Sequence, residues 1–453
     1  MDLELIINSQ RDYFNRDVTK DISFRKHSLE KLLDNILENE AAIYAALRAD
    51  LGKGEVESYT TEISTVINSL EYAIKNIEKW NKPKKVSTPL FMFPGKSKII
   101  REPYGVVLIV APWNYPFLLA MSPLIGAIAA GNCAILKTSK SSPMTSGVVV
   151  DIINSTFERQ HVYAIEEVLP YDDIIKQKYD YIFFTGSERV GKSIMRTASE
   201  NLIPVTLELG GKSPCIVDQT ADIDLCAKKI MWGKLLNAGQ TCVAPDYVLV
   251  HQSVKAKLVD ALKKYEKSMI GDPFNNDDYP HIISLHHFMR IKNLIDKEQD
   301  VIGGRSDDKK LIIEPTILPN ATFESAAMKG EIFGPVLPII EYEEVEEMVY
   351  VLKHMPKPLA CYIFSSSSSF VDYITGNVSF GGGCVNDVIL HLANENLPFG
   401  GVGSSGMGNY HGKSGFDTFS HEKSIYSAQK GLDIKFRYPP YKENSLKLIK
   451  KFL

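Results

Sequence analysis

Apolar residues in the first 80 positions recur at helical spacing. Early in the chain they stand three or four positions apart, at Leu29, Leu32, Leu33, Ile36 and Leu37. Residues 41–51 continue the pattern, and this period predicts helices that bury one face. The pattern stops at the Lys-Pro-Lys-Lys of residues 82–85. The prolines and glycine within residues 86–102 then predict an extended excursion.

From residue 105 onward, short apolar runs alternate with helical segments. We expect strands at residues 106–110, 134–136 and 181–184, and helices at 117–130, 143–157 and from 187. A second series has a helix at 253–268 and strands at 214–218, 247–251, 311–317 and 359–364. Strands separated by helices are typical of parallel sheets with crossover connections. The prediction is an α/β fold with two open parallel sheets, one in each half, and a solvated loop at the five serines 365–369.

Length and composition narrow the class of protein. The chain has 453 residues, which is enough for two or three domains. Hydrophobic residues make up 44% and charged residues 23%, so the chain can bury a large core and disorder is excluded as its main state. The net charge of −4 gives no electrostatic reason to expect nucleic acid as the main partner.

Cysteine usage and the N-terminus indicate a compartment. The six cysteines form no Cys-x-x-Cys pair and are too sparse for a disulfide scaffold, which predicts free thiols in a reducing environment. The N-terminus has no basic segment followed by an apolar one, as a signal peptide would. The longest apolar region, residues 117–131, is interrupted and shorter than the about 20 residues that span a bilayer. We therefore expect a soluble cytoplasmic protein.

Two glycine-rich segments match nucleotide-binding patterns. Residues 401–406 read Gly-Val-Gly-Ser-Ser-Gly but lack a strand before and a helix after them, so a tight loop is expected. Residues 186–193 read Gly-Ser-Glu-Arg-Val-Gly-Lys-Ser and lie between a predicted strand and a predicted helix. That context favours an anion at the helix N-terminus, either the phosphates of a P-loop NTPase or the pyrophosphate of a dinucleotide. Glu188, inside the motif, counts against the NTPase.

Four further segments follow one another along the chain. They read Pro-Trp-Asn-Tyr-Pro at 112–116, Leu-Glu-Leu-Gly-Gly-Lys-Ser-Pro at 207–214, Asn-Ala-Gly-Gln-Thr-Cys at 237–242 and Glu-Ile-Phe-Gly-Pro at 331–335. In this order they resemble the aldehyde dehydrogenase superfamily, and residues 397–401 and 410–421 resemble its class 3 branch. The resemblance covers nearly the whole chain. It implies NAD(P)-dependent oxidation of aldehydes to carboxylic acids, and class 3 relatives take medium- to long-chain aliphatic or aromatic aldehydes.

The resemblance also implies a domain organisation. A Rossmann-type cofactor domain is expected at residues 1–84 and 103–208, and an α/β catalytic domain at 209–420. Residues 85–102 and 421–453 are expected to form a small oligomerisation arm and a tail. In such enzymes the arm completes the sheet of a partner subunit, so we expect a homodimer.

The chemistry of aldehyde oxidation assigns roles to three residues. A hydride leaves the carbon only after a nucleophile has formed a tetrahedral adduct; Cys242 matches the family nucleophile, and the other five cysteines are interpreted as structural thiols. Asn114 is expected to bind the oxyanion with its neutral amide, together with the backbone N–H of Cys242. Glu208 is the expected base that activates water against the resulting thioester. The ten histidines show no zinc spacing and hydride transfer needs no metal, so no metal site is expected.

For the cofactor, NAD or NADP, the resemblance implies binding residues in four segments, at Trp113, Lys137, Lys140, Gly186, Ser187, Val190, Gly191, Glu331 and Phe333. In many NAD-preferring relatives a glutamate, three residues after the lysine that matches Lys137, bonds the adenosine ribose and repels a 2′-phosphate. Lys140 stands at that position here. We therefore expect NADP to be used at least as well as NAD.

Substrate, tail and catalytic competence stay open at this level. Tyr115, Phe117, Met231 and Trp232 are candidates for an apolar entrance to the site. Residues 446–453 interleave three lysines with leucine, isoleucine and phenylalanine. They form either a solvated or dimer-packed tail or a weak peripheral membrane contact. A non-catalytic binding or structural protein of the same family is the remaining alternative, disfavoured by the presence of all three catalytic candidates.

Overall fold

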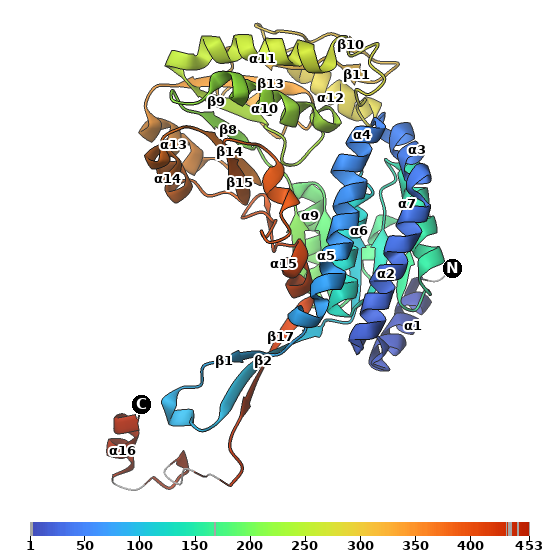
Figure 1. The fold of residues 1–453 in the computed structure, drawn as a ribbon, viewed down its shortest axis with the longest axis vertical. Helices are drawn as coiled ribbons and strands as arrows, with labels where there is room; N and C mark the ends of the chain where they lie inside the picture. Colours follow the sequence, from blue (N-terminus) through green and yellow to red (C-terminus); the bar gives the residue numbers. More distant parts are fainter. Residues whose placement is uncertain (1–2, 167–168, 432, 434–436, 442–443, 453) are drawn as a thin grey trace.

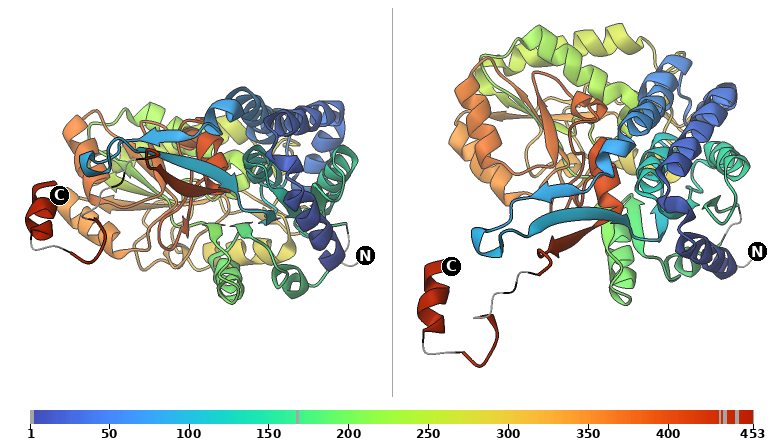
Figure 2. Two further views of the ribbon diagram at one scale, coloured as in Figure 1. Left: turned by 90° about the horizontal axis from the view of Figure 1, so that it is seen from below. Right: turned by 60° about the horizontal axis from the view of Figure 1, so that its bottom comes forward.

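Two lobes and a projecting arm make up the protein. The computed structural model describes residues 3–166, 169–431, 433, 437–441 and 444–452. Each lobe contains a six-stranded sheet, and the arm is a three-stranded sheet. The lobes lie one above the other in Figure 1, with the arm below them, and the views of Figure 2 show it extending away from both.

The sheet of the first lobe has the strand order β16-β7-β6-β3-β4-β5. Its strands are β3 Val106–Val110, β4 Cys133–Lys137, β5 Val162–Ala164, β6 Tyr181–Thr185, β7 Val205–Glu208 and β16 Gly406–Met407. The first five run parallel, and β16 pairs antiparallel with β7. Both faces are covered, because Val107 and Ile109 belong to one apolar core while Val106 and Leu108 belong to the other.

Helices form the outer layers of this lobe. One face is covered by α2 Ile22–Glu38, α5 Ser64–Trp80, α6 Leu118–Ala130 and α7 Pro143–Thr156, with α3 Glu40–Leu51 packed on α7. The other face is covered by α1 Leu3–Asn15, α8 Tyr171–Ile175 and α9 Glu188–Ser199. A short helix, α4 Glu55–Ser58, and a π-helical turn, Tyr59–Ile63, connect α3 to α5.

The second lobe repeats the parallel arrangement with the strand order β12-β13-β9-β8-β14-β15. Its strands are β8 Pro214–Val217, β9 Tyr247–His251, β12 Thr316–Leu318, β13 Val336–Tyr342, β14 Ala360–Phe364 and β15 Gly382–Val385. Its helices are α10 Ile223–Leu235, α11 Lys255–Ile270, α12 Leu285–Ile295, α13 Val345–His354 and α14 Ser368–Asn377. The predicted α/β fold with one parallel sheet in each half is confirmed.

One detailed expectation is wrong and another holds only in part. Leu37 is 48% exposed, because it follows Ile36 by one residue and so points about 100° away from the buried face of α2. The serine run is a solvated loop only in part: Ser366, Ser368 and Ser369 are exposed, but Ser368 and Ser369 begin α14. Ser365 is only 3% exposed and donates to Asp218 Oδ2 at 2.8 Å, and Ser367 caps α14 by accepting from the Phe370 N–H.

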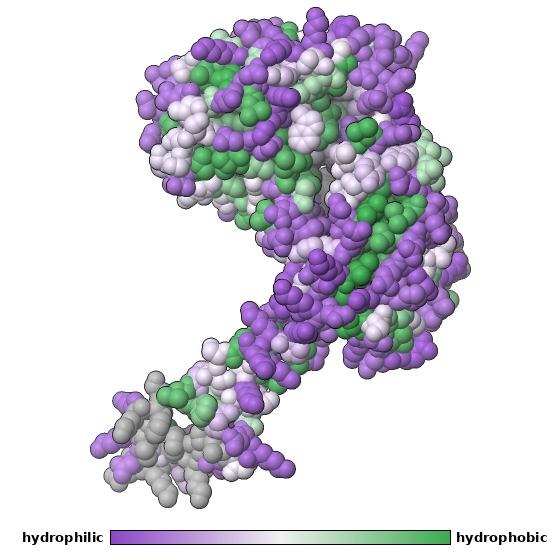
Figure 3. All heavy atoms as spheres, viewed as in Figure 1, coloured by the Kyte–Doolittle hydropathy of each residue, from purple (hydrophilic) through white to green (hydrophobic). Residues whose placement is uncertain are grey.

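The arm is an antiparallel sheet of β1 Lys84–Val86, β2 Lys96–Pro103 and β17 Ser420–Ser427. Apolar side chains gather near its tip (Figure 3), where Leu90, Phe91 and Phe93 are exposed to solvent. Helix α16, Ser445–Phe452, lies beyond the arm (Figure 1). Within the residues that the structure describes, no helix is long and apolar enough to cross a membrane.

The chain returns to the first lobe before it enters the arm. Strand β16 pairs with β7, and α15, Gly412–Thr418, packs on α5 and α6. Both elements fall within the range that the sequence assigned to the catalytic domain. Because β16 lies beside the end of β7, a segment near residue 406 borders the proposed base Glu208.

Candidate active site

Asn114 lies on the loop that follows β3, where that loop meets the second lobe. Its side chain is 3% exposed, and Nδ2 donates to the backbone carbonyl of Gln240 at 3.1 Å. The Asn114 carbonyl accepts from Asn237 Nδ2 at 2.7 Å and from Lys53 Nζ at 3.3 Å. Because an amide nitrogen carries two hydrogens, one N–H of Asn114 remains for a ligand.

Cys242 follows a tightly folded segment at the end of α10. Asn237 and Ala238 adopt left-handed φ angles of 51° and 50°. The Gln240 side chain holds this shape: Nε2 donates to the carbonyls of Asn237 and His281, both at 3.0 Å, and Oε1 accepts from Ile283 N at 3.0 Å. Cys242 then sits in a turn and is partly exposed.

The remaining cysteines differ from Cys242 in their surroundings. Cys133, Cys215, Cys226 and Cys361 are buried, as expected of structural thiols. Cys384 is partly exposed, and its Sγ lies 3.5 Å from His391 Nδ1. All six thiols are free.

Burial and two carboxylates keep the Cys242 thiol protonated. Burial is the main cause that raises its pKa to about 12, and the charges of Glu331 and Glu208 add to the effect. The structure thus brings Cys242 close to both acids that the sequence singled out. Forming the thiolate here requires a neighbouring group that takes the proton or a compensating positive charge.

Glu208 ends β7 and is 2% exposed. Among the described residues, neither of its carboxyl oxygens has a hydrogen-bond partner. Burial raises the pKa of this carboxyl well above its ordinary value, because the charged form is not stabilised. Burial therefore favours the neutral form of Glu208, and the ionised form can act as a base of raised pKa.

The Gly-x-Gly-x-x-Gly segment is the tight loop that the sequence predicts, and it packs against Glu208. Gly406 pairs with Glu208 in the β16–β7 register, and Gly403 bridges to Gly406. Gly406 has a φ of 139°, and a Cβ there would approach the Leu207 carbonyl oxygen to 2.1 Å. Glycine is required so that this loop can close over the end of β7.

The other glycine motif forms a turn that leads into the start of α9. Gly186 follows β6 and donates its N–H to the Glu208 carbonyl at 2.9 Å, and a Cβ there would lie 2.6 Å from the Phe184 ring. Ser187 precedes α9 and makes no capping bond with its side chain, which leaves the first N–H groups of the helix available to a phosphate. Behind the turn, Val190 is half-buried and Gly191 is buried.

The P-loop NTPase alternative does not fit this geometry. Helix α9 already begins at Glu188, so the residues that would form the phosphate loop are helical. Lys192 lies one turn further along and pairs with Glu188 on the exposed helix surface, at 2.5 Å. It is therefore not placed over a phosphate.

Lys137 and Lys140 lie together after β4. Lys137 is half-buried, and its Nζ donates to the Thr138 carbonyl at 2.5 Å. Burial, and to a smaller extent the charge of Lys140, lowers the pKa of Lys137. Lys140 itself is exposed. Two cations thus stand at the carboxyl edge of the sheet after β4, with β3 between them and the turn at Gly186 that follows β6.

Glu331 and Phe333 come from the second lobe. Glu331 packs against Gly210, and its Oε1 is buried without a partner among the described residues. Burial and, to a smaller extent, the charge of Asp246 raise the pKa of Glu331 to about 8. The hydrogen bond from the Gly211 N–H and the charges of Lys212 and Arg290 lower it by less. An unpaired buried oxygen of this kind suits a ligand hydroxyl donor.

An aromatic cluster lies close by. The rings of Trp113 and Phe333 meet edge to face with centroids 5.4 Å apart, and His287 of α12 lies 5.0 Å from Trp113. Burial lowers the pKa of His287 to about 4, so this ring is neutral. His287 was not predicted, since the sequence around the pair His286-His287 carries no signal of its packing partner. This cluster lies in the same part of the molecule as the uncapped N–H groups of α9, the two neighbouring lysines and Glu331, whose Oε1 has no partner among the described residues. The combination fits a dinucleotide.

A cavity of about 900 Å³ lies beside the junction of the lobes, between α3, α4 and α10. Of the four residues considered for an apolar entrance, only Trp232 lines it, while Phe117 and Met231 are buried in the core and Tyr115 is covered by Lys53. Glu57 also lines the cavity and accepts the Asn237 N–H at 2.7 Å, and burial raises its pKa.

Lys53, Glu57 and Glu62 were missed from the sequence. Their charges stand in a helical region rich in charged surface positions, and no pattern distinguishes them. For metals, the described residues contain no group of three histidine, cysteine, aspartate or glutamate side chains able to hold an ion. The expectation of no metal therefore stays a prediction.

Comparison with known proteins gives a consistent set of matches. A model of the aldehyde dehydrogenase family matches residues 1–425. The 4,4′-diaponeurosporen-aldehyde dehydrogenase of Staphylococcus aureus is 49% identical over 444 residues, covering 97% of this chain and 96% of that protein. Aldehyde dehydrogenase family 3 member A2 of Rattus norvegicus is 40% identical, with coverage of 100% and 94%. The substrate-bound structure of Staphylococcus aureus AldH has a TM-score of 0.96 at 48% identity, covering 100% of this chain and 99% of that one.

The charges beside Cys242 predict its reactivity. Replacing Glu331 or Glu208 by glutamine removes a carboxylate that raises the thiol pKa, so more thiolate should form at a given alkaline pH. Alkylation of Cys242 by iodoacetamide, followed by mass spectrometry between pH 7 and 10, should be faster in both variants. Glu341→Gln, an exposed strand position, serves as the control. Equal rates in all four proteins would contradict the proximity of these charges.

Proposed function

This chain belongs to the aldehyde dehydrogenase family, in its class 3-like branch, and we propose that it oxidises medium- to long-chain aliphatic or aromatic aldehydes through a cysteine thioester. At the coarser level it is an NAD(P)-dependent enzyme that converts aldehydes to carboxylic acids. One observation carries the mechanism. Cys242, Asn114 and Glu208 converge where the two lobes meet, beside residues that fit a dinucleotide.

Attack by Cys242 forms the first intermediate. The Cys242 thiol first loses its proton to solvent, which is the proton that the overall oxidation releases. The thiolate sulfur then bonds to the aldehyde carbon, and the carbonyl oxygen takes the electron pair of the broken C=O π bond and becomes an oxyanion. The free N–H of Asn114 and the backbone N–H of Cys242 donate hydrogen bonds to that oxyanion and stabilise it. An amide suits this role because it does not titrate and so remains a donor at every pH of interest. The bond from Asn114 Nδ2 to the Gln240 carbonyl fixes the orientation of the donor before substrate arrives.

Collapse of the adduct leaves a thioester on Cys242. A hydride leaves the substrate carbon in this collapse, and a bound nicotinamide would supply the acceptor for it. The bare start of α9 would hold the pyrophosphate, Lys137 the adenosine ribose and Glu331 the nicotinamide ribose. Glu208 then takes a proton from water as its oxygen bonds to the thioester carbon. The carbon–sulfur bond breaks, the acid leaves, and the proton returns to the Cys242 sulfur.

The substrate class rests on the relatives. The cavity beside α4 and α10 has a volume of about 900 Å³, but Arg48, Glu57 and Asp278 line it beside Trp232, and none of the three proposed catalytic residues does. The relative named for 4,4′-diaponeurosporen-aldehyde is consistent with a large apolar substrate. Reduced cofactor formed with an aldehyde panel, and NAD or NADP, tests this class. An inert protein across the whole panel would favour the binding-protein alternative.

The arm supports a homodimer. Its three-stranded sheet has two open edges, and apolar side chains near its tip are exposed at Leu90, Phe91 and Phe93. Pairing with a second copy would cover both features. A cytoplasmic location stays a prediction from the sequence.

We expect Glu208→Gln to separate the two half-reactions. The first turnover should give a burst of reduced cofactor, followed by slow steady-state turnover, because the thioester forms but is not hydrolysed. In the native enzyme the hydrolysis rate should rise with pH through the raised pKa of Glu208, since only the ionised carboxyl is a base. Stopped-flow absorbance of the reduced cofactor measures both rates. Cys242→Ala should show no burst, Glu422→Gln on the arm should behave as wild type, and normal turnover by Glu208→Gln would refute the assignment.

Lys140 is the expected selector between the two cofactors. An NADP advantage of about 1 kcal/mol, or five- to tenfold in kcat/KM, follows if Lys140 meets the 2′-phosphate in a largely solvated site. Salt should reduce the advantage by screening. Lys140→Glu should shift the ratio toward NAD, while Lys178→Glu, at the opposite edge of the sheet, should not. If the wild-type enzyme does not use NADP, Lys140 does not determine the choice between NAD and NADP.

The C-terminal helix is proposed to touch anionic membranes weakly. Leu446, Lys447 and Lys450 are exposed, while the side chains of residues 448, 451 and 452, and all of residue 453, lie outside the described structure. Each lysine near such a surface contributes about 1 kcal/mol, which gives reversible binding only. Truncation after Tyr441 should reduce co-sedimentation with anionic vesicles, and Lys447→Glu combined with Lys450→Glu should do the same in the full chain. Equal co-sedimentation of the wild-type chain, the truncated chain and the double lysine variant would contradict the proposed membrane contact.

A further inference from the structure

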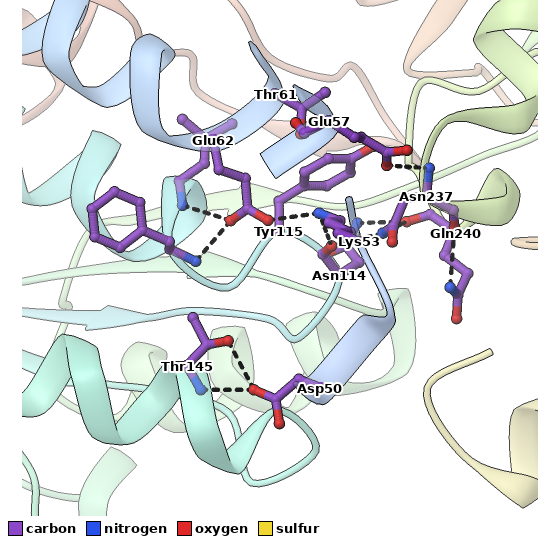
Figure 4. A network of polar contacts seen from close by, with 12 residues as sticks. Asp50, Lys53, Glu57, Thr61, Glu62, Asn114, Tyr115, Thr145, Asn237 and Gln240 are labelled. Carbon is purple, nitrogen blue, oxygen red and sulfur yellow. Dashed lines mark hydrogen bonds and ion pairs between the residues drawn. The ribbon is translucent and has the colours of Figure 1, made fainter. Parts of the chain in front are cut away.

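A fully buried ion pair lies beneath the loop that carries Asn114. Lys53 Nζ is 2.6 Å from Glu62 Oε1, and both side chains are 0% exposed. Lys53 follows α3, in the segment Gly52-Lys53-Gly54, and Glu62 belongs to the π-helical turn Tyr59–Ile63. Figure 4 shows the pair side by side with Asn114 and Tyr115.

The further contacts of the pair fall on one short stretch of chain. Lys53 Nζ donates to the Asn114 carbonyl at 3.3 Å and lies 3.9 Å from the centre of the Tyr115 ring. Glu62 Oε2 accepts the N–H groups of Phe117 and Leu118, at 2.9 and 3.1 Å. Residues 114–118 are thus held at both ends, at the peptide of Asn114 and at the start of α6.

These contacts give the pair a role that stability does not explain. Removing two charges from water costs several kcal/mol per ion, and a well-packed apolar pair is often as stable. Helix α6 has no capping bond from the side chain of Phe117, so Glu62 satisfies its first N–H groups instead. The pair therefore fixes where the helix begins and where the Asn114 peptide lies.

We propose that the Lys53–Glu62 ion pair is the positioning device for the oxyanion-binding amide of Asn114. The Asn114 carbonyl accepts one hydrogen bond from Lys53 Nζ, in the first lobe, and one from Asn237 Nδ2, in the second lobe. The two bonds together fix the plane of the Asn114 peptide. With the plane fixed, Nδ2 can reach the Gln240 carbonyl and still direct its second N–H to the substrate. This role rests on the proposed function, because Asn114 must act as the oxyanion donor.

The chain offers a matched control in Asp50. This carboxylate is 7% exposed and holds the start of α7, accepting from Thr145 N at 2.7 Å and from Met144 N at 3.1 Å. In Figure 4 Asp50 contacts Thr145 and lies apart from the group formed by Lys53, Glu62 and Asn114. Asp50→Asn therefore perturbs a buried helix start of the same lobe without touching the Asn114 loop.

The experiment compares Lys53→Met, Glu62→Gln and Asp50→Asn in the full-length enzyme. Three quantities are measured: the burst rate of reduced cofactor with a saturating aldehyde, the KM for that aldehyde and the thermal midpoint. Lys53→Met and Glu62→Gln should slow the burst about 10- to 100-fold, the effect of a displaced catalytic group, with KM changed less than about threefold. Asp50→Asn should lower the thermal midpoint while the burst stays within about twofold. Iodoacetamide alkylation of Cys242 should be unchanged in all three, since the nucleophile is not displaced.

A double-mutant cycle with Asn114→Ala decides between positioning and general loosening. If the pair acts through Asn114, Lys53→Met should slow the Asn114→Ala enzyme by less than about threefold more. Multiplicative effects, or equal losses in Glu62→Gln and Asp50→Asn, would overturn the positioning role. If Lys53→Met does not fold, the same cycle is measured with Glu62→Gln. This variant keeps an acceptor for the Phe117 N–H, so the start of α6 is retained while the ion pair is lost. A wild-type protein without any burst would instead refute the proposed function itself.

Discussion

The hydrogen bonds around the Asn114 peptide join the two halves of this enzyme. The first lobe supplies Asn114 from the loop after β3, and the second lobe supplies the segment that leads to Cys242. Asn237 and Gln240 contact Asn114 through one donor and one acceptor, at 2.7 and 3.1 Å. A nucleophile and an oxyanion donor on separate lobes act together only if this junction keeps its geometry, because catalysis depends on placement within fractions of an ångström.

Buried carboxyl groups near the junction show how surroundings assign chemical roles. Glu62 is fully buried yet satisfied, by Lys53 and by two backbone N–H groups. Glu208 is equally buried and has no partner among the described residues, so burial raises its pKa. Glu331 lies between these cases, with a pKa of about 8. The satisfied acid holds structure, while the unsatisfied acids remain free for water or ligand.

The glycine motifs illustrate how context decides meaning. The segment at 401–406 matches a dinucleotide fingerprint in letters, yet its glycines allow a loop to close against β7. The segment at 186–193 matches a P-loop in letters, yet its helix starts at Glu188 and its lysine pairs along the helix surface. What the second segment keeps is the strand, glycine turn and helix start, and these suffice to meet a phosphate.

Local pattern in the sequence determined the strands and helices that bury apolar faces, and hence the two parallel sheets, since periodicity reports burial directly. Motifs predicted roles for Cys242, Asn114, Glu208 and the cofactor residues, whose types the proposed chemistry requires, and these roles stay predictions. Sequence could not find Lys53, Glu62 or His287, because their contacts are with residues 9 to 174 positions away. It could not exclude Phe117 and Met231 from the cavity wall either, because burial depends on which elements pack together. Only the tertiary structure decided those contacts. Burial and pairing depend on which elements pack together, and a charged residue on a helix looks the same in sequence whether it faces water or a buried partner.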